Sequence, residues 1–347
     1  MSAPGQRNIR ILSTLGPASL RPAVIKGLEQ RGVDLFRINL SHTALDSLEE
    51  TVRLVQQYSS VPVCLDTEGA QVRCGMMAPD VALRAGQPVR LTPEKVVGTE
   101  ACISLRPAAA FDSLRAGATV SIDFDGALLR VGHTDATGAT AIVVEPGRVK
   151  SNRAVNIDPA PALPALTRKD RRAIEIGARC GVTHYALSFA GSAADVALLR
   201  GLAPAGTSII AKIESRAGVW NRDEIISEAD AVLIDRGDLS REVPLEYVPF
   251  YQKAIVRQAN RWNTPVYVAT NLLESMVTNR RATVAEVNDI ANTLLDGVHG
   301  LVLAAETAVG VDPLGAVDTV RRSIKAFERS TLASLLEEDR GLAAAAG

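Results

Sequence analysis

The chain has 347 residues, which is too long for one compact domain of ordinary size but fits a barrel of alternating strands and helices with an insertion. A net charge of −1 and the absence of a basic block argue against nucleic acid or an anionic membrane surface as a partner. Aromatic residues make up 4% of the chain against 47% for all hydrophobic residues, which favours a core of Val, Ile, Leu and Ala.

The cysteines and the first residues indicate the compartment. Four cysteines and four histidines occur, without C-x-x-C spacing and without zinc spacing, so we expect reduced thiols. Residues 1–8 lack the apolar centre of a signal peptide, and no apolar segment is long enough to span a bilayer. We therefore expect a soluble, cytoplasmic protein.

The first part of the chain alternates strands with helices. Gly16 and Pro17 form a turn between the first strand and the first helix, and polar residues follow each strand at its C-terminal end. The expected elements are strands at 9–13, 33–39 and 61–65 and helices at 22–30 and 46–57.

Helical periodicity disappears between about residues 74 and 150. Short apolar runs are separated there by turns rich in Gly, Asp and Thr, which predicts a small all-β insertion. The glycines expected to form its turns are Gly117, Gly126, Gly132 and Gly138.

The alternation then resumes and gives eight strands outside the insertion. The further strands are expected at 183–187, 209–213, 231–234, 266–269 and 301–303, and the further helices at 168–180, 193–202, 217–227, 245–262, 284–295 and 313–327. The pattern predicts an α/β fold, a TIM (β/α)8 barrel with the all-β insertion after its third strand. The expected domains are a discontinuous barrel, 1–73 and 151–330, an insertion, 74–150, and a C-terminal tail, 331–347. An open doubly wound sheet is the alternative, but no Gly-rich dinucleotide loop follows the first strand.

The stretch from Ser208 to Leu239 carries the strongest chemical signal. Lys212 and Glu214 lie two residues apart at the end of one expected strand, and Asp238 follows the next strand. Carboxylates beside an amine at one end of a barrel predict a divalent metal site next to a cationic group. Taken alone, Lys212 and Glu214 fit a structural ion pair at a strand end better than a functional site, and it is Asp238 and Thr270 on adjacent strands that favour the functional interpretation.

Several motifs together resemble the pyruvate kinase family. They are Phe36-Arg-Ile-Asn-Leu-Ser-His42, Leu65-Asp-Thr-Glu-Gly-Ala-Gln-Val-Arg73, Leu166-Thr-Arg-Lys-Asp170, Ala211-Lys-Ile-Glu214, Arg236-Gly-Asp-Leu239, Ala269-Thr-Asn-Leu-Leu-Glu-Ser-Met276 and Glu306-Thr-Ala308. The resemblance covers the whole barrel and, more loosely, the insertion, which corresponds to the family's lid. No segment resembles the family's C-terminal domain, so we expect no sugar-phosphate activation, and we expect a homodimer through the barrel helices.

The resemblance implies a role for each matching residue. Glu214 and Asp238 would bind Mg²⁺ (or Mn²⁺), Lys212 would face the transferred phosphoryl group, and Thr270 would lie near the enolate carbon that takes a proton. Arg37 would contact phosphate groups, although it could equally tie a loop to Asp66. The residues implied in substrate or nucleotide binding are Arg73, Ser188, Gly237 and Arg153, and those implied in a K⁺ site are Asn39, Ser41, Asp66 and Thr67.

Other positions depart from the family pattern. Glu68 stands where the family has Lys, Gln71 stands where a Glu or Lys separates K⁺-dependent from K⁺-independent members, and Asp235 replaces a small residue beside the substrate carboxylate. The resemblance implies a glycolytic, ATP-binding transferase that moves a phosphoryl group between phosphoenolpyruvate and ADP, giving pyruvate and ATP. Two alternatives stay open, a relative that uses the same metal and enolate chemistry on another small acid, and a non-catalytic metabolite-binding protein.

Overall fold

The computed structural model describes residues 9–123 and 126–345 and divides the chain into two units. The first unit reaches Glu68 and resumes at Ala165, and the second unit is Gly69–Pro164. The second unit therefore begins five residues before the expected boundary at 74 and ends fourteen residues after the one at 150.

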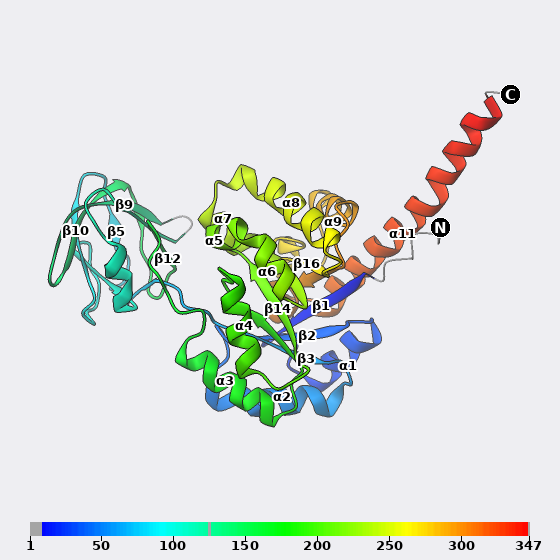
Figure 1. Ribbon diagram of the computed structural model, residues 1–347, viewed down its shortest axis with the longest axis horizontal. Coiled ribbons are helices and arrows are strands. Elements are labelled where there is room, and N and C mark those ends of the chain that lie inside the picture. Colours follow the sequence, from blue (N-terminus) through cyan, green and yellow to red (C-terminus); the bar gives the residue numbers. More distant parts are fainter. Residues whose placement is uncertain (1–8, 124–125, 346–347) are drawn as a thin grey trace. The chain divides into compact units, whose positions relative to one another are not determined.

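Eight parallel strands of the first unit close into a barrel, as the sequence predicts (Figure 1). Their order around the barrel is β1-β17-β16-β15-β14-β13-β3-β2. The strands are β1 (Arg10–Leu15), β2 (Leu35–Asn39), β3 (Val63–Asp66), β13 (His184–Leu187), β14 (Ser208–Ile213), β15 (Ala231–Asp235), β16 (Val266–Ala269) and β17 (Gly300–Leu303). Because β3 pairs directly with β13, the chain returns to the barrel at the next position after the insertion.

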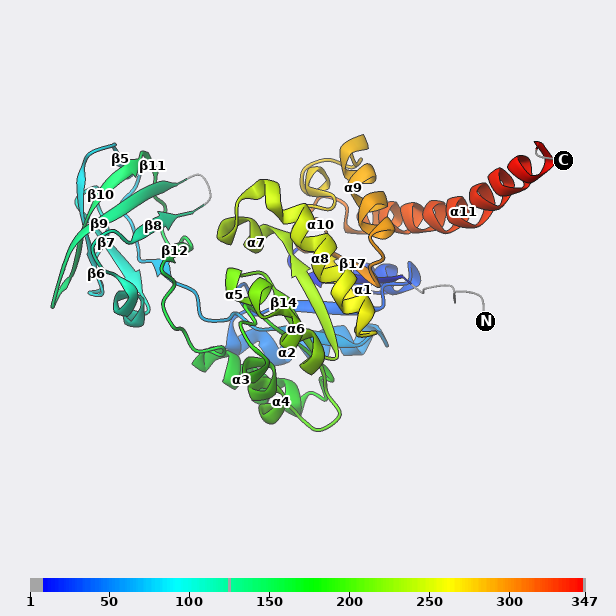
Figure 2. The same cartoon turned by 45° about the horizontal axis from the view of Figure 1, so that its top comes forward.

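Helices lie on the outside of these strands (Figures 1 and 2). They are α1 (Pro22–Gln30), α2 (Leu45–Tyr58), α3 (Arg168–Arg179), α4 (Ala193–Leu202), α5 (Arg216–Trp220), α6 (Arg222–Glu228), α7 (Arg236–Glu242), α8 (Val248–Arg261), α9 (Val284–Leu295), α10 (Ala305–Ala308) and α11 (Pro313–Ala345), with short 3-10 turns η2 (Leu245–Tyr247) and η3 (Glu274–Val277). No helix in the described ranges combines the length and the apolar character that crossing a membrane requires.

Two helices differ from the sequence expectation. The helix expected at 217–227 is divided at Asn221, which leaves helical geometry and donates its side-chain amide to the Gly191 carbonyl at 2.7 Å. The last helix does not end near residue 327, since α11 continues through most of the segment expected as a tail.

The barrel strands are buried on both faces, which explains their continuous apolar runs. One set of side chains fills the barrel interior, and the other packs under the helices. The interior set is Leu12, Leu35, Cys64, Ala186, Ile210, Ala231, Leu233, Tyr267, Ala269 and Val302. Because the strands are rigid, polar residues at their C-terminal ends take fixed positions.

The second unit is built on a seven-stranded sheet with its own apolar core. The order is β12-β8-β9-β10-β6-β7-β4, and a two-stranded pair joins β5 and β11. The strands are β4 (Arg73–Cys74), β5 (Ala82–Leu83), β6 (Pro88–Thr92), β7 (Cys102–Arg106), β8 (Thr119–Ile122), β9 (Ala127–Asp135), β10 (Gly138–Glu145), β11 (Gly147–Arg148) and β12 (Val155–Asp158), with a 3-10 turn η1 (Ala108–Ser113).

The pairing of β12 with β8 explains why this unit extends past residue 150. One expected turn is wrong, because Gly132 lies inside β9. Gly117 and Gly138 do adopt positive φ angles, of 88° and 144°, and a side chain at Gly138 would collide with the Leu91 carbonyl.

Candidate active site

The barrel brings the residues of the Ser208–Leu239 stretch to its C-terminal end. Lys212 lies near the end of β14, Glu214 follows directly, and Asp238 lies in the first turn of α7 after β15. The parallel pairing of β14 with β15 sets Lys212 opposite Leu233 and Ile213 opposite Ile234, so both chains leave the barrel side by side. This end of a (β/α)8 barrel is where active sites lie.

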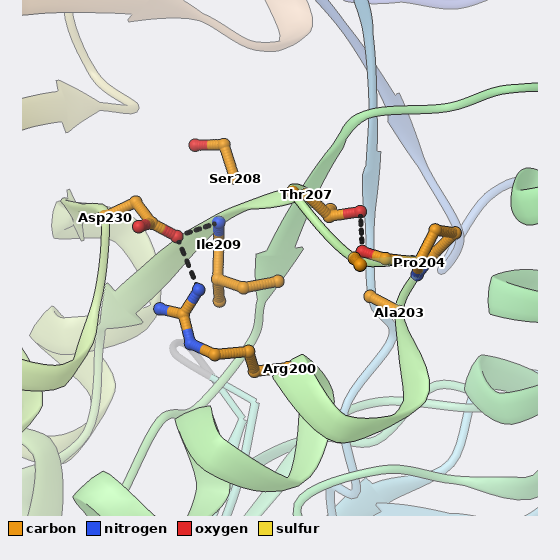
Figure 3. Close-up of a pocket in the computed structure, with 9 residues that line it drawn as sticks. Arg200, Ala203, Pro204, Thr207, Ser208, Ile209 and Asp230 are labelled. Carbon is orange, nitrogen blue, oxygen red and sulfur yellow. Dashed lines mark hydrogen bonds and ion pairs between the residues drawn. The ribbon is translucent and has the colours of Figure 1, made fainter.

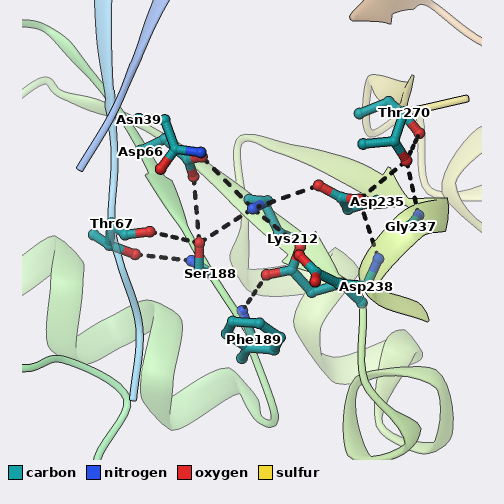
Figure 4. A network of polar contacts seen from close by, with 12 residues as sticks. Asn39, Asp66, Thr67, Ser188, Phe189, Lys212, Asp235, Gly237, Asp238 and Thr270 are labelled. Atoms are coloured by element: carbon teal, nitrogen blue, oxygen red, sulfur yellow. Dashed lines mark hydrogen bonds and ion pairs between the residues drawn. The ribbon is translucent and has the colours of Figure 1, made fainter. Parts of the chain in front are cut away.

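Lys212 is at the centre of a buried polar network (Figure 4). Its Nζ lies 3.0 Å from Glu214 Oε2, 3.6 Å from Asp66 Oδ2 and 3.8 Å from Asp235 Oδ2, and it donates to Ser188 Oγ at 3.2 Å. Burial by itself would lower the pKa of Lys212, but the three carboxylates outweigh burial and raise it. Lys212 is therefore a fixed positive charge at neutral pH.

Asp66 links Lys212 to Arg37. Arg37 donates from Nε to Asp66 Oδ2 at 2.8 Å and also from Nη2, and its Nη1 donates to Thr14 Oγ1 at 2.9 Å. Ser188 completes this side, since its Oγ donates to the Thr67 carbonyl at 2.6 Å and its N–H donates to Thr67 Oγ1 at 2.9 Å. These contacts agree with the structural role considered for Arg37 in the sequence, in which its side chain binds Asp66.

Glu214, Asp235 and Asp238 form an acid cluster in which one carboxylate oxygen from each residue lies within 4.8 Å of the other two. Burial raises the pKa of Glu214 to about 8, against the opposing effect of Lys212, and burial followed by the charge of Asp235 raises the pKa of Asp238. Glu214 Oε1 accepts from the Phe189 N–H at 2.8 Å, whereas the buried Oε2 has Lys212 Nζ as its partner at 3.0 Å. Three hard carboxylate oxygens grouped in this way fit a divalent cation such as Mg²⁺.

Thr270 lies on the other side of the acid cluster, directly after β16. Its Oγ1 accepts from the Gly237 N–H at 2.8 Å and is 3.1 Å from Asp235 Oδ1. Its φ of 67° is an outlier for a β-branched residue, and Asn271 and Phe189 also have positive φ at strand ends in this region. Such strain persists where the surroundings enforce it, which is typical of functional sites.

The other residues expected in the site divide between the two units. Asn39 and Ser41 lie at the end of β2, where Asn39 Oδ1 accepts from the Ser41 N–H at 2.9 Å. Arg73 and Arg153 belong to the second unit, so they are not among the residues that the barrel brings together. Within that unit Arg73 donates to Gln71 at 2.8 Å, and Arg153 lies 3.3 Å from Asp123.

The sequence did not identify two contributors to the candidate active site. The Phe189 backbone N–H orients Glu214, and a main-chain donor leaves no trace in residue type. Asp235 was noted in the sequence as a departure from the family pattern but not as a member of the acid cluster, to which it belongs. Its place as the last residue of β15, three residues before Asp238, is the signal that could have identified it.

A surface pocket lies at the opposite end of β14 (Figure 3). Its charged groups are already engaged, since Asp230 Oδ2 accepts from the Ile209 N–H at 2.8 Å and from Arg200 Nη1 at 2.9 Å. Because the N-terminal face of such barrels serves stability, this pocket is not the candidate active site.

Fold and site together define a (β/α)8-barrel enzyme with a buried lysine beside an acid cluster of a composition that suits a metal ion. Comparison with known proteins agrees with this class. The sequence model described as pyruvate kinase, barrel domain, matches residues 6–317. This chain therefore belongs to the pyruvate kinase family, and it is a transferase of the kinase type.

Individual relatives show the extent of the similarity. A pyruvate kinase of Methylorubrum extorquens is 36% identical over 94% of this chain and 70% of its own length, and pyruvate kinase 2 of Synechocystis is 34% identical over 95% and 58%. A crystal structure of a pyruvate kinase from Cryptosporidium parvum superposes with a TM-score of 0.86 at 30% identity, over 94% of this chain and 70% of that one. The chain thus spans between about half and three quarters of the length of these relatives.

Proposed function

We propose that this chain transfers a phosphoryl group between phosphoenolpyruvate, or a close analogue, and ADP, with Mg²⁺ (or Mn²⁺) bound by Glu214 and Asp238. One observation carries the proposal, namely that the buried Lys212 ammonium lies 3.0 Å from Glu214 at the end of the barrel that carries active sites. When bound, the divalent ion would offset negative charge on phosphate oxygens.

Lys212 acts in this proposal as a fixed charge and not as a proton donor. Its raised pKa keeps it protonated at neutral pH, so it can offset charge on the equatorial oxygens of the transferred group throughout the reaction. Ser188 and Asp66 hold the ammonium in place through the contacts described above.

Thr270 is assigned to the proton transfer at the enolate carbon. Its hydroxyl accepts from the Gly237 N–H and can donate to the Ala269 carbonyl at 2.6 Å or to Asp235 Oδ1 at 3.1 Å, and its backbone is held in a strained conformation. A positioned hydroxyl can pass a proton from solvent to carbon, which would complete the conversion of the enolate to pyruvate.

The remaining roles implied by the family belong to the same proposal. They are substrate or nucleotide binding by Arg37, Arg73, Ser188, Gly237 and Arg153, and a K⁺ site of Asn39, Ser41, Asp66 and Thr67. A K⁺ ion there would have to share Asp66 with Arg37 and Lys212, so replacing K⁺ by an organic cation in the assay tests this part separately. A glycolytic role and a homodimer through the barrel helices are likewise proposed.

A coupled assay with phosphoenolpyruvate, ADP, Mg²⁺ and K⁺ tests the function. We expect Lys212→Met to lower kcat by about 100-fold or more, the size typical of removing a preorganised electrostatic contact. Lys253→Met is the matched control, because this lysine lies on the outer helix α8 and pairs with Asp296. Lys212→Arg is a second variant that keeps the positive charge, so it shows whether lost activity in Lys212→Met comes from the missing charge or from a folding defect.

Two results would contradict different parts of the proposal. Full activity of Lys212→Met would exclude the role of Lys212. Failure of the folded wild type to turn over phosphoenolpyruvate, while it binds Mn²⁺, would exclude that substrate but leave the metal site intact. The presence of Asp235 in the acid cluster specifically favours the second candidate, an enzyme of this family that acts on another small molecule.

A further inference from the structure

Two consecutive residues of the candidate active site, Thr270 and Asn271, have backbone conformations that their side chains disfavour. Their φ angles are 67° and 54°, in the left-handed region that glycine adopts most easily, and Thr270 is also β-branched. Such a pair persists where neighbouring groups hold the backbone in place. The groups that hold this pair therefore also determine where the Thr270 hydroxyl lies.

The guanidinium of Arg236 contacts the strained pair directly. Arg236 is the first residue of α7, and its side chain is buried. Its Nε and Nη2 donate to the Thr270 carbonyl at 3.1 and 2.8 Å, and Nη2 also donates to the Asn271 carbonyl at 3.1 Å. One planar group thus binds two consecutive carbonyls, which fixes the orientations of two successive peptide units.

Asp289 holds the other edge of the same guanidinium. Arg236 Nη1 donates to Asp289 Oδ1 at 3.0 Å and lies 2.8 Å from Oδ2, and Asp289 belongs to α9. The guanidinium therefore spans from α9 to the loop that follows β16. A lysine would supply the charge but not this planar arrangement of donors.

A second buried side chain, that of Glu306, supports the same loop further along. Glu306 Oε1 accepts from the Leu273 N–H at 3.1 Å, and Oε2 accepts from the Ala304 N–H at 2.8 Å. Glu306 therefore ties the loop after β16 to the start of α10. Arg236 acts on the strained pair itself, and Glu306 acts two residues later in the loop.

The fixed backbone sets the position of the Thr270 side chain (Figure 4). Thr270 Oγ1 accepts from the Gly237 N–H at 2.8 Å and lies 3.1 Å from Asp235 Oδ1 in the acid cluster. Because Gly237 directly follows Arg236, the first two residues of α7 hold both the backbone and the hydroxyl of Thr270. A change of φ toward an ordinary value would turn Cβ and move the hydroxyl away from Gly237.

We propose that Arg236 is a positioning residue, which fixes the Thr270 hydroxyl beside the acid cluster by holding the carbonyls of Thr270 and Asn271. Arg236 acts through Thr270 and not by touching the substrate or the metal. The importance of the hydroxyl rests on the proposed function, but its placement can be measured without turnover.

Amide hydrogen exchange of the metal-free protein tests the placement. The reporting amide is that of Gly237, whose N–H donates to Thr270 Oγ1. We expect Arg236→Met and Arg236→Lys each to raise the exchange rate of this amide by about 10-fold or more, because the acceptor is no longer held in place. The rate should approach that of Thr270→Ala, in which the acceptor is missing.

Arg200→Met is the matched control for this experiment. Arg200 also binds one carboxylate, that of Asp230, and one carbonyl, that of Glu228, but it lies at the opposite end of the barrel. It should leave the exchange rate of the Gly237 amide unchanged, and thermal melts would verify that each variant is folded. Asp289→Asn is a milder variant, which keeps the guanidinium but weakens its anchor, and it should raise the rate by a smaller factor.

Steady-state kinetics with phosphoenolpyruvate and ADP test whether Arg236 acts through Thr270. We expect Arg236→Met to lower kcat by up to about 100-fold with a smaller change in KM, as displacement of a reacting group typically does. In the double variant with Thr270→Ala, kcat should be no lower than in Thr270→Ala alone, because residues that act through one contact are not additive. Arg236→Lys should not restore kcat, whereas a role of charge alone predicts that it would.

The outcomes separate this inference from the proposed function. An unchanged exchange rate of the Gly237 amide in folded Arg236→Met or Arg236→Lys would overturn the inference, whatever the kinetics show. Losses of kcat that multiply in the double variant would also overturn it, since Arg236 would then act on another group. A wild type that turns over no phosphoenolpyruvate, together with faster exchange in the Arg236 variants, would refute the proposed substrate and leave the positioning of Thr270 standing.

Discussion

Removing the charge of Lys212 should destabilise the metal-free barrel strongly. Three carboxylates, Asp66, Glu214 and Asp235, lie within 3.8 Å of Nζ, and all four side chains are at most 5% exposed. In Lys212→Met these carboxylates keep their burial but lose their shared cation. Breaking a buried ion pair by removing one partner typically costs about 3–5 kcal/mol.

This cost is large relative to the stability of ordinary domains, about 5–15 kcal/mol. For a unit of the size of this barrel it corresponds to a fall in the melting temperature on the order of 10 °C. Arg53→Met is the control, because Arg53 pairs with Glu49 at 3.5 Å on the exposed face of α2. An exposed helical pair of this kind contributes only about 0.3–0.5 kcal/mol.

The pH dependence gives the prediction a second, independent check. Burial raises the pKa of Glu214 in the folded protein to about 8, above the pKa of a carboxyl group in the unfolded chain. The folded protein therefore binds this proton more tightly than the unfolded chain does. The resulting contribution to the free energy of unfolding is present at low pH and is lost as the pH rises through about 8. Without Lys212 the carboxylates depend still more on bound protons. The difference in melting temperature between Lys212→Met and the wild type should therefore be larger at about pH 9 than at about pH 6.

Calorimetric melts of the metal-free proteins at these two pH values measure both effects. Added Mn²⁺ should restore part of the lost stability, because a bound cation replaces the missing positive charge. A melting temperature within about 2 °C of the wild type at pH 9 would refute the reasoning, since it would mean that the carboxylates near Lys212 are not held together by its charge.

The remaining predictions concern metal binding and Thr270. Mn²⁺ affinity of the wild type should rise between about pH 6 and pH 8 and level off above about pH 9, because the metal needs the ionised form of Glu214, whose pKa burial raises to about 8. Titration calorimetry should show that the Mn²⁺ affinity of Glu214→Gln depends less on pH than that of the wild type. An equally steep pH dependence would contradict the role of Glu214 as the titrating metal ligand. Thr270→Ala should lower kcat for phosphoenolpyruvate by about 100-fold with a smaller change in KM, while Thr270→Ser, which keeps the hydroxyl, retains most activity in steady-state kinetics. Equal kcat values for the two variants would show that the hydroxyl takes no part.

The sequence determined the barrel because its strands are buried on both faces. One example is the continuous apolar run Val232–Ile234, which is typical of a strand buried on both faces. The charged residues that follow it mark the end of the strand. The same periodicity identified Lys212, Glu214 and Asp238 as strand-end residues. Local pattern could not locate the end of the insertion, since β12 joins that sheet through pairing with the distant β8.

Only the tertiary structure decided what these residues contact. In the sequence Arg37 could bind a phosphate or tie a loop to Asp66, and the fold shows its guanidinium bound to Asp66 and Thr14. Asp235 changed most, from an isolated departure to a buried partner of Lys212 and Thr270. Residue type and spacing specify which side of a strand a group occupies, but the closing of eight strands sets the distances between groups, and those distances decide which charges pair.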